Sequence, residues 1–169
     1  MSEQPLTHLD AHGGVRMVDV GGKAITRRTA TAEAIVRISS ELAEAIRQDQ
    51  VKKGNVLETA KLAGILAAKQ TASLIPLCHS LPLDAVDIRA TLDDQAVRLT
   101  AEARTSWSTG VEMEAFTAVS VAALTIIDMG KAIDPAIVVE RIRLLEKTGG
   151  KRGHWRADES AEERSGAAS

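Results

Sequence analysis

Aromatic side chains and cysteine are scarce in this chain of 169 residues, which has no tyrosine, one phenylalanine, two tryptophans and one cysteine. So few aromatic rings leave no platform on which single-stranded bases could stack. The chain also lacks a basic excess, since its formal net charge is -2, whereas dedicated nucleic-acid binders normally carry a positive one. Both scarcities argue against a nucleic-acid partner.

Signals for export and for membrane insertion are missing as well. The lone Cys78 cannot form an internal disulfide, which favours a reducing, cytoplasmic compartment. Residues 1–14 lack a basic patch followed by an apolar run, and no segment approaches the roughly 18 apolar residues of a membrane span. We therefore expect a cytoplasmic chain of one domain with no membrane partner.

Hydrophobic periodicity predicts the order of strands and helices. The predicted strands cover 32–38, 86–92, 97–103 and 136–147, although a helix competes for the last, and 15–20 is a short strand or an extended segment. The predicted helices run from Ser39 or Ser40 to about 50, from Asn55 to just before Pro76, and over 109–134. Gly64 inside the second helix indicates a close packing contact, because glycine there costs about 1 kcal/mol relative to alanine.

The predicted order of elements matches the split β-α-β arrangement of a ferredoxin-like α+β sandwich. The antiparallel sheet would carry its helices on one face. The other face has no cover in the chain, and a bare apolar face favours oligomer formation. Residues 1–14 are expected to form a flexible N-terminal arm, 15–155 a single catalytic domain, and 156–169 a disordered C-terminal tail.

The charges of the long apolar helix are concentrated at its two ends. Glu112 and Glu114 lie in the first turn, and Thr109 followed by Glu112 has the spacing of a capping box. Asp128 lies in the last turn, where the helix dipole disfavours an acid. Lys131 follows on nearly the same face, so the two residues fit an ordinary ion pair and a proton-transfer pair equally well.

These two ends are too far apart to serve one site within a single chain. At 1.5 Å per residue, Glu114 and Asp128 lie roughly 21 Å apart along the helix axis, so two chains would have to supply a shared site. Elsewhere, a lone His79 beside prolines is more often structural than catalytic. Cys78 and His79 make a poor metal site, because adjacent side chains of an extended segment point to opposite faces. The sequence predicts no metal and no cofactor.

Several long stretches carry a family resemblance: LTHLDAHGGVRMVDV (6–20), KGNVLETAKLAGILAAKQ (53–70), LIPLCHSLPL (74–83), TGVEMEAFTAVSVAALTIIDMGKAID (109–134) and RLLEKTGGK (143–151). Over about residues 6–155 the chain resembles the MoaC family, the cyclic pyranopterin monophosphate synthases of molybdenum cofactor biosynthesis. The resemblance implies a homohexamer, a trimer of dimers, with its active site at a dimer interface. It also implies conversion of a 3′,8-cyclised dihydroguanosine 5′-triphosphate to cyclic pyranopterin monophosphate, with release of pyrophosphate.

The resemblance further implies roles for individual residues. Asp128 would be the catalytic acid or base, with Lys131 and Lys53 as its partners in proton transfer. The implied substrate-binding residues are Leu77, Cys78, His79, Glu112, Met113, Glu114, Arg28, Lys69, Lys147 and Lys151. The chain departs from the usual family pattern at Ser80, Ile127 and Gly130, none of which is a proposed catalytic group. The alternative is a ferredoxin-like oligomer that binds a nucleotide or small anion as a regulatory module without catalysis.

Overall fold

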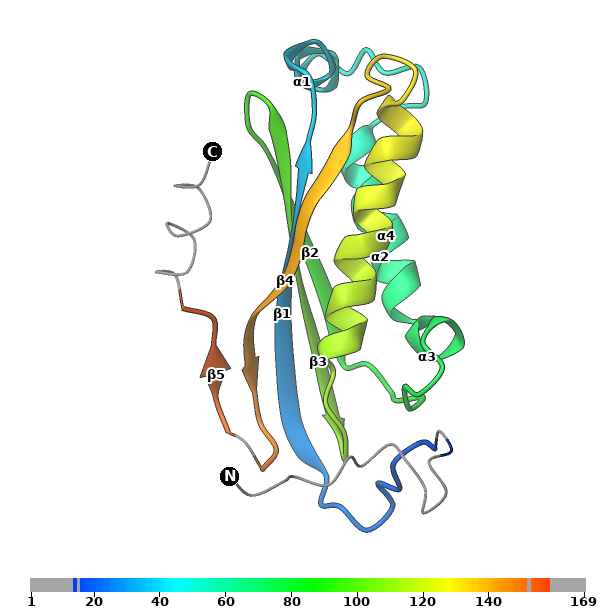
Figure 1. Ribbon diagram of the computed structural model, residues 1–169, viewed down its shortest axis with the longest axis vertical. Coiled ribbons are helices and arrows are strands. Elements are labelled where there is room, and N and C mark those ends of the chain that lie inside the picture. Colours follow the sequence, from blue (N-terminus) through cyan, green and yellow to red (C-terminus); the bar gives the residue numbers. More distant parts are fainter. Residues whose placement is uncertain (1–13, 15, 152, 159–169) are drawn as a thin grey trace.

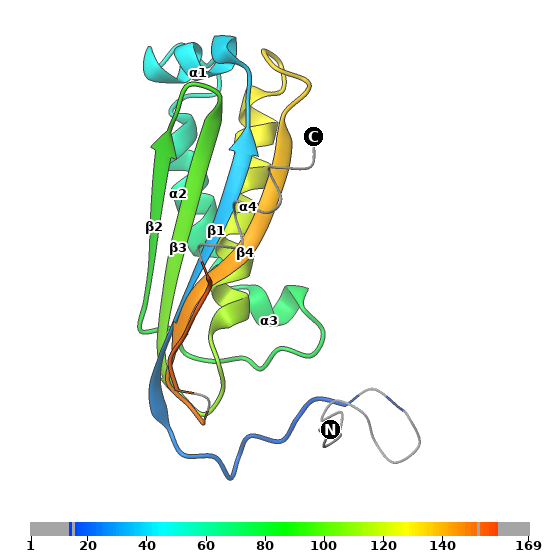
Figure 2. The ribbon, with the colours of Figure 1, turned by 60° about the vertical axis from the view of Figure 1, so that its left-hand side comes forward.

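The computed structural model describes Gly14, residues 16–151 and residues 153–158 of the chain. Its single sheet is antiparallel and has the strand order β2-β3-β1-β4-β5. The strands are β1 (Thr26–Arg37), β2 (Ala85–Leu92), β3 (Ala96–Trp107), β4 (Val138–Thr148) and β5 (Trp155–Arg156). The helices are α1 (Ser40–Arg47), α2 (Val56–Ala68), α3 (Thr71–Leu74) and α4 (Glu112–Gly130). In both ribbon views α2 and α4 lie side by side against one face of the sheet (Figures 1 and 2).

This arrangement confirms the predicted ferredoxin-like α+β sandwich with its helices on one face. The capping signals at the first two helices are also confirmed, because Ser39 and Asn55 each accept a hydrogen bond from a backbone N–H of the first turn. Residues 138–148 form a strand, which rejects the competing helix. The segment 16–20 is neither helix nor strand, while the turn predicted at the glycines that follow it is present.

Small residues form the contact between the sheet and its helices. On β1, Ala30, Ala32 and Ala34 are at most 1% exposed, and each pairs with a buried residue of β3. Alanine side chains leave room for a helix to approach the sheet closely. The helix pair is close as well, because a Cβ atom built on Gly64 of α2 would lie 2.7 Å from the carbonyl oxygen of Ala118 in α4. The close contact predicted at Gly64 is therefore present.

The uncovered face of the sheet is charged, so the expectation of a bare apolar face is wrong. Glu33 of β1 projects from this face yet is only 4% exposed, because Arg98, Arg141 and Arg143 surround its carboxylate. Burial alone would raise the pKa of Glu33, but hydrogen bonds and charge from Arg98 and Arg143 outweigh it and lower that pKa. The alternation of apolar residues correctly predicted which side chains face the helices. It did not predict that charged side chains cover the opposite face of the sheet.

Several exposed apolar side chains lie on the helix layer. Leu62 and Leu66 of α2 and Leu124 of α4 are 58%, 54% and 60% exposed. By length and composition α4 is also the one helix among the described residues that could cross a membrane. This differs from the expectation that no segment is apolar enough to span one. More than half of that stretch, 56%, is buried inside the chain, and α4 packs on both α2 and the sheet. The apolar character of α4 therefore matches its place in the core.

The structure describes few residues of the predicted arm and tail. Apart from Gly14, the predicted arm lies outside the described residues. At the other end, Lys147 and Glu146 of β4 pair with Trp155 and Arg156 of β5. Regular structure therefore reaches the first residue of the predicted tail, and residues 159–169 lie outside the described part.

Replacing Gly64 with alanine tests the close packing of α2. A Cβ atom there would also lie 2.5 Å from Cδ1 of Ile88, and the backbone of Ala118 cannot move away cheaply. We expect Gly64→Ala to lower the free energy of unfolding by about 1–2 kcal/mol, because the overpacking exceeds the gain in helix propensity. Urea unfolding measures this change. Gly22→Ala, where nothing lies within 4 Å, should stay within about 0.5 kcal/mol, and an equal effect of both variants would contradict the packing argument.

Candidate active site

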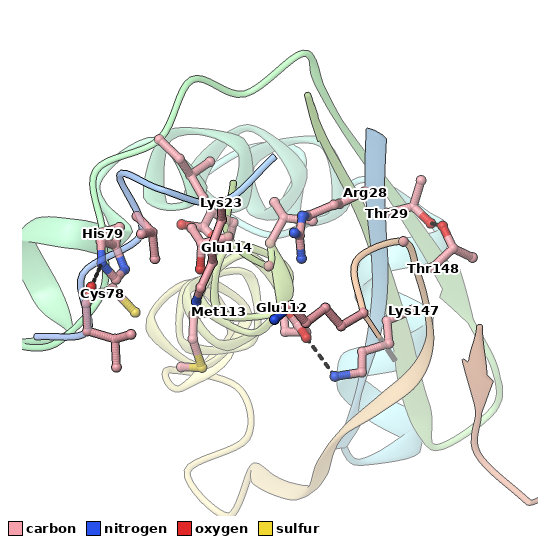
Figure 3. A pocket seen from close by; sticks show the side chains of 18 of the residues that line it. Lys23, Arg28, Thr29, Cys78, His79, Glu112, Met113, Glu114, Lys147 and Thr148 are labelled. Atoms are coloured by element: carbon pink, nitrogen blue, oxygen red, sulfur yellow. Dashed lines mark hydrogen bonds and ion pairs between the residues drawn. The ribbon is translucent and has the colours of Figure 1, made fainter. Parts of the chain in front are cut away.

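A cavity of about 450 Å³ lies at the end of the molecule where α4 begins. Its wall combines residues before β1, the start of β1, the connector after α3, the first turn of α4 and the end of β4. The volume is typical of small-molecule sites. Most of the substrate-binding residues that the resemblance implies line this cavity, namely Arg28, Leu77, Cys78, His79, Glu112, Met113, Glu114, Lys147 and Lys151 (Figure 3).

Glu112 is held by a lysine of β4, and Thr109 does not form the predicted capping box with it. The residue before α4 is Val111, which makes no side-chain capping bond, so the predicted capping box is wrong. The carboxylate of Glu112 instead accepts a hydrogen bond from Nζ of Lys147 at 2.8 Å. Burial would raise the pKa of Glu112, but this bond, a hydrogen bond from its own backbone amide and the charges of Lys147 and Arg28 lower it. Glu112 is therefore an ionised, ion-paired group.

Glu114 lies two residues further along α4 and is in a different electrostatic state. It is 4% exposed, and burial together with the neighbouring charge of Glu112 raises its pKa from 4.5 to about 7. Burial and the proximity of Glu114 likewise raise the pKa of the Cys78 thiol. Near neutral pH the cavity thus contains a carboxyl group that can be protonated or ionised, beside an un-ionised thiol.

Arg28 is fixed in place by backbone atoms. Its Nε and Nη2 atoms donate to the carbonyl oxygens of Trp107 and Ser108, at 3.1 and 3.2 Å. Gly149 and Gly150, with φ of +91° and +69°, pass directly against this side chain, where a Cβ atom on either would lie 2.4 Å from an atom of residue 27 or 28. The glycine pair therefore allows the end of β4 to approach Arg28.

His79 makes the structural hydrogen bond that the sequence favoured. Its Nε2 atom lies 2.6 Å from the carbonyl oxygen of Val18, in the segment before β1 (Figure 3). The same segment brings Lys23 into the cavity wall. Lys23 is not among the residues predicted from the sequence, where its local signal is the glycine turn directly before it.

The proposed proton-transfer residues form a second cluster at the other end of α4. Nζ of Lys53 lies 2.7 Å from one carboxylate oxygen of Asp128, and Nζ of Lys131 lies 2.8 Å from the other. Hydrogen bonds and charge from the two lysines lower the pKa of Asp128 to about 2. About half of each side chain is exposed, so the cluster is an open surface group. Its catalytic role stays a prediction.

The single chain does not unite these two groups. None of the cluster residues lines the cavity, and Lys69, at the end of α2, does not line it either. In an α-helix of 19 residues the two ends are separated by roughly 27 Å. Among the described residues, no group of three or more His, Cys, Asp and Glu side chains could hold a metal ion.

The match to a known protein family covers both the cavity and the cluster around Asp128. The sequence model of the MoaC family matches residues 17–150, which include the cavity wall from Val18 to Gly149 and the whole cluster around Asp128. The chain belongs to the MoaC family. Its membership rests on most of the chain and not on a short motif.

Individual relatives of this MoaC-family chain agree. A protein of Novosphingobium aromaticivorans named cyclic pyranopterin monophosphate synthase is 54% identical over 91% of this chain and 98% of its own length. A Bordetella avium protein of the same name is 56% identical over 90% of this chain and 96% of its own length. The Drosophila melanogaster molybdenum cofactor biosynthesis protein 1 is 53% identical over 90% of this chain, which covers 27% of that longer protein.

The raised pKa of Glu114 predicts a specific dependence of stability on pH. The unfolded chain releases this proton near pH 4.5, whereas the folded chain holds it up to about pH 7. Stability from this group is therefore full at low pH and is lost as the pH rises through that window. Between about pH 5 and pH 8 the unsubstituted protein should therefore lose on the order of 2 kcal/mol more free energy of unfolding than Glu114→Gln. Urea unfolding of both proteins across this pH range measures the difference.

Asp128→Asn is the matched control for this experiment. The pKa of Asp128 is lowered to about 2, so its carboxylate is ionised in both the folded and the unfolded chain across the same pH window, and it lies at the other end of α4. Its substitution should change stability without changing the pH slope in that window. A pH slope unaffected by Glu114→Gln would show that this carboxyl is ionised in the folded chain throughout.

Proposed function

We propose that this chain is a cyclic pyranopterin monophosphate synthase. It converts (8S)-3′,8-cyclo-7,8-dihydroguanosine 5′-triphosphate to cyclic pyranopterin monophosphate, with release of pyrophosphate, in molybdenum cofactor biosynthesis. The observation that carries this proposal is the identity of 54% across 91% of the chain to a relative of that name. Such relatives give no support to the non-catalytic, anion-binding alternative. We place the reaction in the cytoplasm.

The cavity supplies groups suited to recognising such a substrate. We assign the triphosphate to the cations Arg28, Lys147 and Lys151, because fixed positive groups stabilise phosphate charge in a site sheltered from water. The guanine-derived ring presents both donors and acceptors, and we assign it to Glu112 and Glu114. An ionised carboxylate only accepts hydrogen bonds, whereas a protonated carboxyl can also donate, so the different pKa values of these two residues allow both kinds of contact.

The lysine cluster supplies groups suited to proton transfer. Opening and reclosing the ring of the substrate requires protons to be moved, which a lysine can do. We propose that Asp128, which is ionised at neutral pH, holds the ammonium groups of Lys53 and Lys131 toward the reacting atoms. The sequence left open whether Asp128 and Lys131 form an ordinary ion pair or a proton-transfer pair. In this proposal they do both, because the carboxylate that binds the lysines also orients them.

We further propose that a second copy of the chain completes the site. The cavity and the cluster lie at opposite ends of α4, so a two-fold axis near the middle of that helix would bring the cluster of one copy to the cavity of the other. The exposed Leu62, Leu66 and Leu124 lie on the same helix layer, where burial against a second copy would be favourable. Three such dimers would form the hexamer.

Subunit mixing tests whether the site is shared. Asp128→Asn removes the cluster, and Glu112→Ala removes a cavity group that is far from it; each variant alone should lose about 100-fold or more in turnover. In mixed dimers, one of the two sites combines an intact cavity with an intact cluster. Random exchange of equal amounts should therefore restore about a quarter of the normal rate of pyrophosphate release.

Two controls accompany this measurement. Lys53 and Asp128 belong to the same cluster, so mixing Lys53→Ala with Asp128→Asn should restore nothing. Size-exclusion chromatography must show that every variant keeps the oligomeric state of the unsubstituted protein. If verified subunit exchange between Glu112→Ala and Asp128→Asn restores no activity, each chain contains its own complete site and the shared site is wrong. Absence of turnover by the unsubstituted protein would instead contradict the proposed function.

A further inference from the structure

The segment before β1, residues 16–25, crosses the end of the molecule where α4 begins (Figures 1 and 2). We call this segment the N-terminal strap. It contains no helix or strand. Val18 and Val20 are partly buried and line the cavity, whereas Met17 and Asp19 are exposed. This alternation means that one side of the strap faces the cavity and the other faces outward.

Few hydrogen bonds hold the strap in this position. Two of them are internal: the amide of Gly21 donates to the Asp19 carboxylate at 2.8 Å, and the amide of Lys23 donates to the Val20 carbonyl at 3.1 Å. Among hydrogen bonds between described residues, the bond of His79 to Val18 is the one that ties the strap to the connector after α3, which forms another part of the cavity wall.

The chemistry of this bond fixes the state of the His79 ring. A backbone carbonyl oxygen only accepts hydrogen bonds, so Nε2 of His79 must carry the proton and donate it. While the bond is closed, Nε2 is not available as a base. A direct catalytic use of that nitrogen and its contact with the strap therefore exclude each other at any one moment.

The strap also carries a cation into the site. Lys23 lies five residues beyond Val18, after the glycine turn, and lines the same cavity as Arg28, Lys147 and Lys151. Its backbone position depends on the strap, whereas Arg28 and Lys147 stand on strands of the central sheet. Release of the strap would thus remove Lys23 from the cavity and leave the other cations in place.

We propose that His79 is a positioning residue: its hydrogen bond to the Val18 carbonyl holds the N-terminal strap against the cavity, and the strap places Lys23 beside the phosphate groups of the substrate. The substrate named in this statement rests on the proposed function. The attachment of the strap by His79 does not, since it involves only groups of the chain itself. The two parts can therefore be tested separately.

Hydrogen exchange in the absence of substrate tests the attachment. The hydrogen-bonded amides of the strap are those of Gly21 and Lys23. We expect His79→Ala to accelerate exchange of these two amides by about tenfold, which corresponds to the loss of one hydrogen bond. His79→Gln should restore slow exchange, because the side-chain amide of glutamine can donate to the same carbonyl. His154→Ala is the matched control, since His154 bonds to Glu146 through the same ring atom at 2.6 Å but does not line the cavity. Unchanged exchange in His79→Ala would overturn the proposal.

Steady-state kinetics test the delivery of Lys23. We expect His79→Ala and Lys23→Ala each to raise KM about tenfold with a smaller effect on kcat, and the double variant to go little beyond either one. His79→Gln should recover the normal KM. Independent effects that multiply to about 100-fold, or a loss confined to kcat, would show that His79 acts directly and would refute its positioning role. Lys61→Ala, a lysine paired with Glu58 on α2, controls for loss of a positive charge.

Discussion

Close packing of α4 against the alanine-rich face of the sheet is the constraint on which the rest of the structure depends. Ala30, Ala32 and Ala34 of β1 offer little side-chain volume, and Gly64 of α2 offers none, so α4 is held tightly from two sides. A helix fixed in this way cannot easily tilt or slide, because any displacement would open voids or create clashes. The positions of both ends of α4 follow from this contact, and with them the positions of Glu112, Glu114 and Asp128.

The electrostatic character of each end is then set by what lies beside it. The N-terminal end of a helix favours negative charge, yet only Glu112 has a cation within hydrogen-bonding distance there, while Glu114 is buried beside a like charge. The C-terminal end disfavours an acid, and Asp128 is stable as an anion because two lysines contact it. The helix therefore carries two ionised carboxylates paired with lysines and one carboxyl with a raised pKa, which sequence position alone would not have distinguished.

The sequence predicted the elements well, because most of them depend on local signals. Ser39 and Asn55 start helices through contacts within one turn, and the alternation of β1 and β3 reflects burial of one face. The errors arose where distant residues decide the outcome. Glu112 forms an ion pair with Lys147, thirty-five residues away, in place of the expected local cap. In the same way, Glu33 is buried by arginines from two other strands, which reversed the expected character of the open face.

The candidate site shows the same division. The family resemblance indicated which residues to examine, but only the fold showed that the cavity residues and the cluster of Asp128 with its lysines belong to separate places. It also brought in Lys23, because a strap crossing the cavity has no periodic signal. Lys69 lies outside the cavity of the single chain, and its role stays a prediction.

In the proposed function this separation links catalysis to assembly. The cavity and the proposed proton-transfer groups are held roughly 21 Å apart by a rigid helix, so a single chain cannot bring them together by a small internal movement. A second copy placed across α4 would meet both groups at a fixed spacing. We propose that the exposed leucines of the helix layer set the register in which two incomplete sites become two complete ones. The stiffness that keeps the two groups of one chain apart would then make the shared geometry reproducible.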